Sequence, residues 1–120
     1  MNEATGMGIG VALAGMLFQV ISLPLIWGKV PMNRYYGIRI AASFESNERW
    51  YAINAHGGRL MARWGWVTVA WGAAGWLVPA SYRLMYVGLS PLALLIPLGS
   101  AVLWTLVWAH KAHPSHEKVQ

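Results

Sequence analysis

Polar chemistry is concentrated in one short block of this chain, the sequence KVPMNRYYGIR at residues 29–39. Arg34 and Arg39 carry planar guanidinium groups, which match the geometry of carboxylates and phosphates. Asn33 can both donate and accept hydrogen bonds. These side chains predict a polar pocket for a lipid headgroup, a peptide or a partner protein. The alternative is a structural role, in which the same groups fix the segment in place and satisfy its backbone.

The residues after this block predict a short helix. Ser46 is a favourable N-cap, and Glu48 falls in the first turn, where the helix dipole favours an anion. Gly57 and Gly58 would end this helix or act as a hinge toward the next apolar stretch. We expect the helix to be amphipathic and to lie in the plane of the lipid headgroups.

The block and the short helix are expected to contact each other. Pro31 favours an extended chain at the start of the block, and Gly37 permits a tight turn. Trp50 and Asn54 lie one helical turn apart on the same face. Asn54 is therefore expected to form hydrogen bonds with the backbone of the extended segment.

The two arginines of the block have different expected roles. Arg34 stands beside two tyrosines, which predicts an anchor at the membrane interface. Arg39 lies near the bilayer and needs a partner there, for which Glu45 and Glu48 are the candidates. Both a binding role and a structural role are open for Arg39.

Three uncharged stretches are long enough to cross a membrane as helices: residues 7–27, 64–82 and 91–109. At 1.5 Å per residue each would reach roughly 28–31 Å, close to the ~30 Å hydrocarbon core. Ser90 followed by Pro91 predicts the start of the third helix. The expected fold is an all-α integral membrane protein with a single membrane domain, residues 1–120. It has three transmembrane helices and a structured cytoplasmic loop at residues 28–63.

The basic residues predict the orientation of these helices. With three crossings, eight of the nine lysines and arginines fall on one side of the membrane, and only Arg83 falls on the other. The side rich in positive charge is cytoplasmic by the positive-inside rule. The N-terminus is therefore expected outside and the C-terminus inside.

Composition argues against several classes of function. Charged residues make up 11% of the chain, whereas a soluble domain has about 25%. The absence of cysteine excludes disulfides, thiol nucleophiles and thiolate metal sites. No Ser-His-Asp set, carboxylate pair or phosphate-binding loop is recognisable, so neither an enzyme nor a cofactor is expected. Because juxtamembrane cations follow from topology, the net charge of +5 does not predict nucleic-acid binding.

The C-terminal tail contains three histidines at spacings of three, His110, His113 and His116. Pro114 interrupts the helix that would bring them together, and no carboxylate or thiolate stands at ligand spacing. We therefore expect a polar cytoplasmic tail and no metal site.

Small residues predict how the helices pack. Gly6, Gly10 and Ala14 form a small-xxx-small ridge in the first stretch, and Ala70 and Ala74 form another in the second. These ridges are expected to join helices within one chain. A homo-oligomer is the alternative.

Two runs of residues resemble the signature of the SdpI family of small bacterial membrane proteins. They are Pro31-x-Asn33-x-x-x-Gly37-x-Arg39 and Trp50-x-x-x-Asn54-x-x-Gly57-Gly58, and the resemblance extends over about residues 20–80. The family pattern often has a proline after the arginine, where this chain has Ala41-Ala42. The founding member protects the producing cell from a secreted sporulation-delaying toxin, and it holds a transcriptional repressor at the membrane.

The resemblance implies a protein of the bacterial cytoplasmic (inner) membrane that acts by binding. The expected role is immunity to, or sensing of, a membrane-active peptide toxin, with the basic loop docking a cytoplasmic regulator. The expected binding residues are Asn33, Arg34, Arg39, Trp50 and Asn54, and the expected structural residues are Pro31, Gly37, Gly57 and Gly58. The alternative function is a small accessory or scaffold subunit of a larger membrane protein complex.

Overall fold

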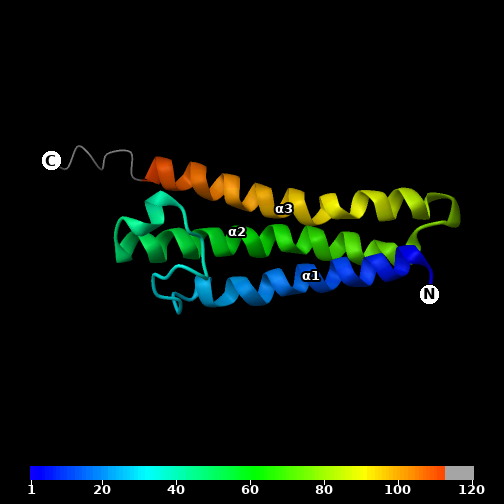
Figure 1. Cartoon of the computed structure of the whole chain (residues 1–120), viewed down its shortest axis with the longest axis horizontal. Helices are drawn as coiled ribbons and strands as arrows, with labels where there is room; N and C mark the ends of the chain where they lie inside the picture. Colours follow the sequence, from blue (N-terminus) through cyan, green and yellow to red (C-terminus); the bar gives the residue numbers. More distant parts are fainter. Residues whose placement is uncertain (113–120) are drawn as a thin grey trace.

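Three long helices lie side by side in the computed structural model, which describes residues 1–112 (Figure 1). The helices are α1 (Glu3–Ile26), α2 (Asn47–Ala74) and α3 (Arg83–Ala112). Short 3₁₀ helices lie in the connections: η1 (Ala41–Phe44), η2 (Gly75–Leu77) and η3 (Ala80–Tyr82). The described residues contain no strand, and the predicted all-α fold is confirmed.

The bundle is longer than a membrane is thick. It measures 63 × 24 × 19 Å, against a hydrocarbon core of about 30 Å. Glu3–Ile26 and Ala80–Lys111 are long and apolar enough to cross a membrane. The connection between α1 and α2 lies at the same end of the bundle as the C-terminal end of α3, and the N-terminus lies at the other end (Figure 1).

α2 is one continuous helix, so the predicted short amphipathic helix with a separate second span at residues 64–82 is wrong. Ser46 caps α2 as predicted, and its hydroxyl accepts a hydrogen bond from the Arg49 N–H at 3.0 Å. Gly57 and Gly58 do not end the helix or act as a hinge, because both are buried against neighbouring segments. α2 ends at Ala74, and η2 and η3 occupy most of residues 75–82.

α3 begins at Arg83, so the start predicted at Ser90 and Pro91 is wrong. Both residues lie inside the helix, where the Ser90 hydroxyl donates to the carbonyl of Tyr86 at 2.8 Å. The predicted helix start at Ser90 is therefore not used, and α3 continues through both residues as a longer helix of the bundle.

A second proline in α3 explains one contact between helices. Pro97 has no N–H, so the carbonyl four residues earlier, that of Ala93, loses its usual donor. The hydroxyl of Thr68 on α2 donates to this carbonyl at 2.7 Å. α2 thus supplies the hydrogen bond that the proline removes from α3, as neighbouring helices commonly do in membranes.

α1 and α2 pack backbone against backbone along two series of residues spaced by seven. Gly8 and Gly15 on α1 face Gly72 and Gly65 on α2. A Cβ on Gly72 would lie 2.5 Å from the Gly8 carbonyl oxygen, and one on Gly15 would lie 3.0 Å from the Gly65 carbonyl oxygen. A seven-residue spacing keeps one seam facing the partner along the helix, and small residues let the backbones approach closely.

The small-residue ridges predicted from the sequence do not form the close contact between α1 and α2. A Cβ on Gly10 would meet nothing within 4 Å, and one on Gly6 would meet only the Met1 side chain at 3.9 Å. Ala70 and Ala74 line a groove between α2 and α3 rather than the contact with α1. The informative pattern was the spacing of seven, not the spacing of four.

Candidate functional site

Asn33 organises the first half of the segment between α1 and α2. Its Oδ1 accepts hydrogen bonds from the N–H groups of Tyr35 at 2.8 Å and Tyr36 at 2.7 Å. Its Nδ2 donates to the carbonyls of Pro31 at 2.7 Å and Tyr36 at 3.0 Å. An asparagine that replaces backbone partners in this way stabilises a tight turn. The side chain is thus engaged inside the loop.

Asn54 joins the second half of the loop to α2. Its Oδ1 accepts the N–H of Ile38, and its Nδ2 donates to the carbonyls of Trp50 at 2.9 Å and Ile38 at 3.4 Å. The predicted contact between Asn54 and the backbone of the extended segment is confirmed. Because Asn54 is buried, loss of its amide would leave polar backbone groups of the loop without their partners.

The side chain of Trp50 packs beneath the loop and bonds to its backbone. Its indole Nε1 donates to the carbonyl of Val30 at 2.8 Å, and its ring lies 5.5 Å from that of Phe44 between centroids. Trp50 and Asn54 are both buried, which confirms that they share one face of the helix, and Ile53 is buried as well. Burial of an indole with its N–H satisfied contributes strongly to stability.

Two glycines allow the loop to approach the bundle. Gly37 has a φ of +122°, and a Cβ there would lie 2.8 Å from Asn54 Oδ1. A Cβ on Gly57 would lie 1.9 Å from Ile38 Cδ1 and 3.0 Å from Thr105 Oγ1 on α3. Ile38 therefore occupies a notch over both α2 and α3, which the missing Gly57 side chain creates.

These residues form one unit, which we call the polar latch: Asn33, Gly37, Ile38, Trp50, Asn54 and Gly57. The latch brings together most of the predicted site residues through hydrogen bonds and close packing. Pro31 accepts the hydrogen bond from Asn33. Gly58 lies outside the latch, because a Cβ there would lie 3.2 Å from the carbonyl oxygen of Ser22 in α1.

The two arginines of the loop are exposed. Arg39 donates through Nη1 to the carbonyl of Arg34. The predicted pairing of Arg39 with Glu45 or Glu48 is wrong, because Glu45 instead forms a salt bridge with Arg49 at 3.2 Å. The latch therefore presents two cations at the surface of the loop.

Arg49 is a residue that sequence reasoning missed. It is only 7% exposed, and its Nη2 lies 3.5 Å from the carbonyl oxygen of Ala109, in the last turn of α3. A cation is favourable there because the carbonyl end of a helix carries partial negative charge. The signal that could have found this pair was the spacing of four between Glu45 and Arg49.

His56 lies farther along α2, where its ring stacks on Trp108 of α3 with centroids 4.1 Å apart. Burial, and then the guanidinium groups of Arg59 and Arg63, lower the pKa of His56 below its usual value. Of the remaining tail residues, His113, His116 and Lys118 lie outside the described part of the chain.

Comparison with known proteins gives one match. The family model of the SdpI/YfhL protein family matches residues 29–109. No curated protein matches the chain, and no solved structure matches it. The matched range contains the whole polar latch, all of α2 and most of α3.

Proposed function

The chain belongs to the SdpI/YfhL protein family and is an SdpI-like membrane protein; from this premise we propose that it protects against, or senses, a membrane-active peptide toxin. It acts by binding rather than by catalysis, and its loop docks a cytoplasmic regulator. The single observation that carries this proposal is the polar latch, which holds Arg34 and Arg39 at the surface of a loop fixed on the bundle.

The proposed topology has three crossings, with the N-terminus outside and the loop in the cytoplasm. α2 carries Arg59 and Arg63, so its composition alone does not mark it as a span. Its depth is supported by its contact with α1, because Gly65 packs at Gly15 and Gly72 packs at Gly8. A membrane crossed by α1 therefore also contains this part of α2.

The orientation is supported by charge. Lys29, Arg34 and Arg39 belong to the connection between α1 and α2, and Lys111 belongs to the last turn of α3. These two segments lie at the same end of the bundle (Figure 1), whereas Arg83 is the first residue of α3, at the opposite end. Positive charge on one side of a membrane protein favours retention of that side in the cytoplasm.

Single cysteines test the topology, since the chain has no cysteine of its own. Tyr35→Cys in the loop and Ser81→Cys between α2 and α3 both replace exposed side chains. A membrane-impermeant maleimide added to intact cells should label Ser81→Cys, whereas Tyr35→Cys should need permeabilised cells. Labelling of Tyr35→Cys in intact cells would contradict the proposed orientation.

Challenge of cells with a sporulation-delaying peptide toxin tests the function. Cells without the gene should die, and cells with the restored gene should survive. The double variant Arg34→Gln/Arg39→Gln should remain folded and still bind the peptide in the membrane, but it should lose the response of the regulator. Equal survival with and without the gene would rule out immunity to that peptide, and an unchanged regulator response in the double variant would rule out docking through these arginines.

A further inference from the structure

The surface between α2 and α3 contains a row of four hollows that share lining residues. Leu60 and Trp104 line both of the hollows nearest the loop end, Val67 links the second hollow to the third, and Leu89 links the third to the fourth. The hollows therefore form one continuous groove along the two helices, which we call the α2–α3 groove.

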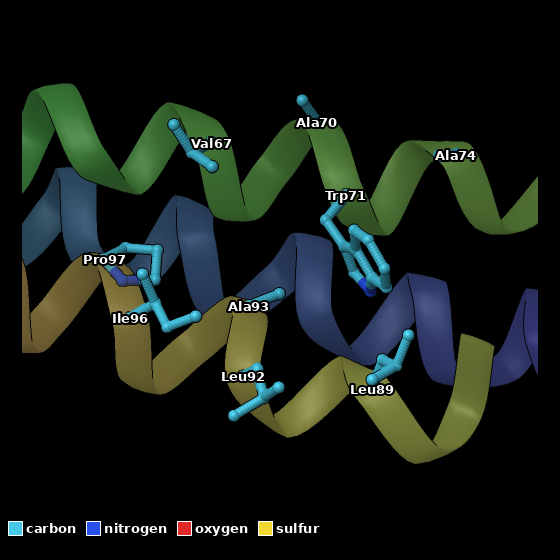
Figure 2. A pocket seen from close by; sticks show the side chains of 9 residues that line it. All are labelled: Val67, Ala70, Trp71, Ala74, Leu89, Leu92, Ala93, Ile96 and Pro97. Carbon is cyan, nitrogen blue, oxygen red and sulfur yellow. The ribbon is translucent and has the colours of Figure 1, made fainter. Parts of the chain in front are cut away.

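The middle of the α2–α3 groove is almost entirely apolar. Its largest hollow has a volume of 590 Å³ and is lined by alkyl and aromatic groups of both helices. Figure 2 shows the side chains of Val67 and Trp71 on α2 opposite Leu89, Leu92 and Ile96 on α3. Such a surface suits a hydrocarbon chain.

The loop end of the groove has a different chemistry. Arg63 lines one hollow, and Lys111 lines the next together with His56. Both cations are exposed, and Trp104 and Trp108 lie beside them in the same two hollows. Cations with tryptophans at one end of an apolar groove are complementary to a molecule with an anionic head and an apolar tail.

The length of the groove also fits such a molecule. Trp104 and Leu92 lie 12 residues apart on α3, which corresponds to ~18 Å along the helix. One leaflet of the hydrocarbon core is about 15 Å deep, half of the ~30 Å total. The length of the apolar part of the groove, from Trp104 to Leu92, is thus close to the depth of one leaflet.

We infer that the α2–α3 groove binds one anionic phospholipid of the cytoplasmic leaflet, with its phosphate at Arg63 and Lys111 and an acyl chain along Val67, Ala70 and Ile96. The inference rests on the proposed membrane topology but not on the toxin or the regulator. It assigns Arg63 and Lys111, which lie outside the polar latch, to a lipid site.

Native mass spectrometry of the protein in mild detergent tests this site with phosphatidylglycerol and phosphatidylcholine as probes. The unmodified protein should retain one phosphatidylglycerol at collision energies that remove phosphatidylcholine. The double variant Arg63→Gln/Lys111→Gln should lose at least tenfold in apparent affinity for phosphatidylglycerol. The double variant Lys29→Gln/Arg34→Gln removes the same two charge types from the loop and should retain the lipid.

A second variant tests the apolar part of the groove. Ala70→Trp places an indole into the largest hollow from an exposed position away from α1, and it should weaken retention of both lipids while thermal unfolding stays unchanged. Equal retention of the two lipids, or equal loss in the loop variant, would overturn the inference. A stable dimer that Ala70→Trp dissociates would instead show that a second copy occupies the groove.

The outcome is separable from that of the proposed function. Protein that protects cells but retains no phosphatidylglycerol would overturn the lipid site alone. Protein that retains this lipid without protecting cells would overturn the immunity role alone.

Discussion

The two surfaces of α2 pack against their neighbours in different ways. Toward α1, glycines bring the backbones together, and added Cβ atoms would meet backbone atoms within 3.0 Å at Gly15 and Gly72. Toward α3, side chains fill the space. Trp71 stacks on Tyr86 with centroids 5.0 Å apart and donates to the Ser90 hydroxyl at 2.9 Å.

This difference explains why a groove lies between α2 and α3. Packing and hydrogen bonds, rather than the hydrophobic effect, hold helices together in lipid. Backbone contact between α1 and α2 leaves little space, whereas large side chains between α2 and α3 separate the helices and leave the α2–α3 groove. Substitutions in the contact between α1 and α2 are therefore expected to be more destabilising than substitutions in the contact between α2 and α3.

The largest effect is expected from a methyl group between α1 and α2. Gly72→Ala would place a Cβ 2.4 Å from the Ala12 nitrogen, so it should lower the free energy of unfolding by about 1–3 kcal/mol or more. Gly10→Ala is the matched control, because its Cβ would meet nothing within 4 Å, and it should be neutral or stabilising by up to ~1 kcal/mol. Denaturant unfolding in detergent measures both, and equal effects would contradict the close packing.

A smaller effect is expected from the polar latch, where Ile38 lies over the end of the α2–α3 contact. Asn54→Ala leaves the backbone N–H and carbonyl of Ile38 without their partner and should cost about 1–3 kcal/mol. Hydrogen exchange should accelerate in residues 29–40 while the α1–α2 contact stays protected. Asn54→Asp keeps only the acceptor and turns a carboxylate oxygen toward the Ile38 and Trp50 carbonyls in a buried position, so it should cost at least as much as Asn54→Ala. Exchange that is unchanged in the loop would show that the latch does not hold it.

A still smaller effect is expected inside the α2–α3 contact. Thr68→Val removes the donor to the Ala93 carbonyl and should cost about 0.6–1.7 kcal/mol, the range for such bonds between membrane helices. Thr105→Val is a matched control, since its hydroxyl donates to Ala101 within the same helix at 2.7 Å. Unfolding in detergent compares the two variants. A larger loss for Thr105→Val would contradict the role assigned to the proline-freed carbonyl.

The smallest effect is a pH dependence at the same contact. Burial and two arginines hold the pKa of His56 below its usual value, and Lys111 lines the same hollow. The folded state therefore favours neutral His56, so its stability is complete above about pH 6.5 and falls as the pH drops below that value. Thermal unfolding between pH 7.5 and 5.0 should show this fall, and His56→Gln should reduce it. An identical profile in the variant would assign the effect to other groups.

The sequence predicted individual local features better than their connections. The Ser46 cap, the turn at Gly37 and the contact of Asn54 with the loop backbone are all confirmed. Each depends on residues within about twenty positions and on one backbone conformation or hydrogen bond. The apolar stretches at residues 7–27 and 91–109 likewise correspond to α1 and to part of α3.

The failures share one physical cause, since they concern residues whose role depends on a distant partner. Gly57 and Gly58 suggest a helix end in isolation, yet each fits a neighbour and the helix continues through them. Glu45 lies near Arg39 in the sequence, but it pairs with Arg49, whose other partner is the carbonyl of Ala109, 60 residues farther along the chain. Gly6 and Gly10 satisfied a local spacing of four, but a Cβ on either would meet no atom of α2 within 4 Å.

The sequence by itself determined the class of this protein, because charge content, apolar stretches and the spacing of the family motif are properties of the chain alone. It also singled out five of the six residues of the polar latch, but not Ile38, which fits over Gly57. Tertiary structure decided which glycines join the helices, where α2 ends, and that cations and an apolar groove lie in line between α2 and α3. These features depend on how each helix is rotated about its own axis relative to its neighbours. Side-chain volumes and backbone contacts between the packed helices determine that rotation, so the sequence of one helix alone does not.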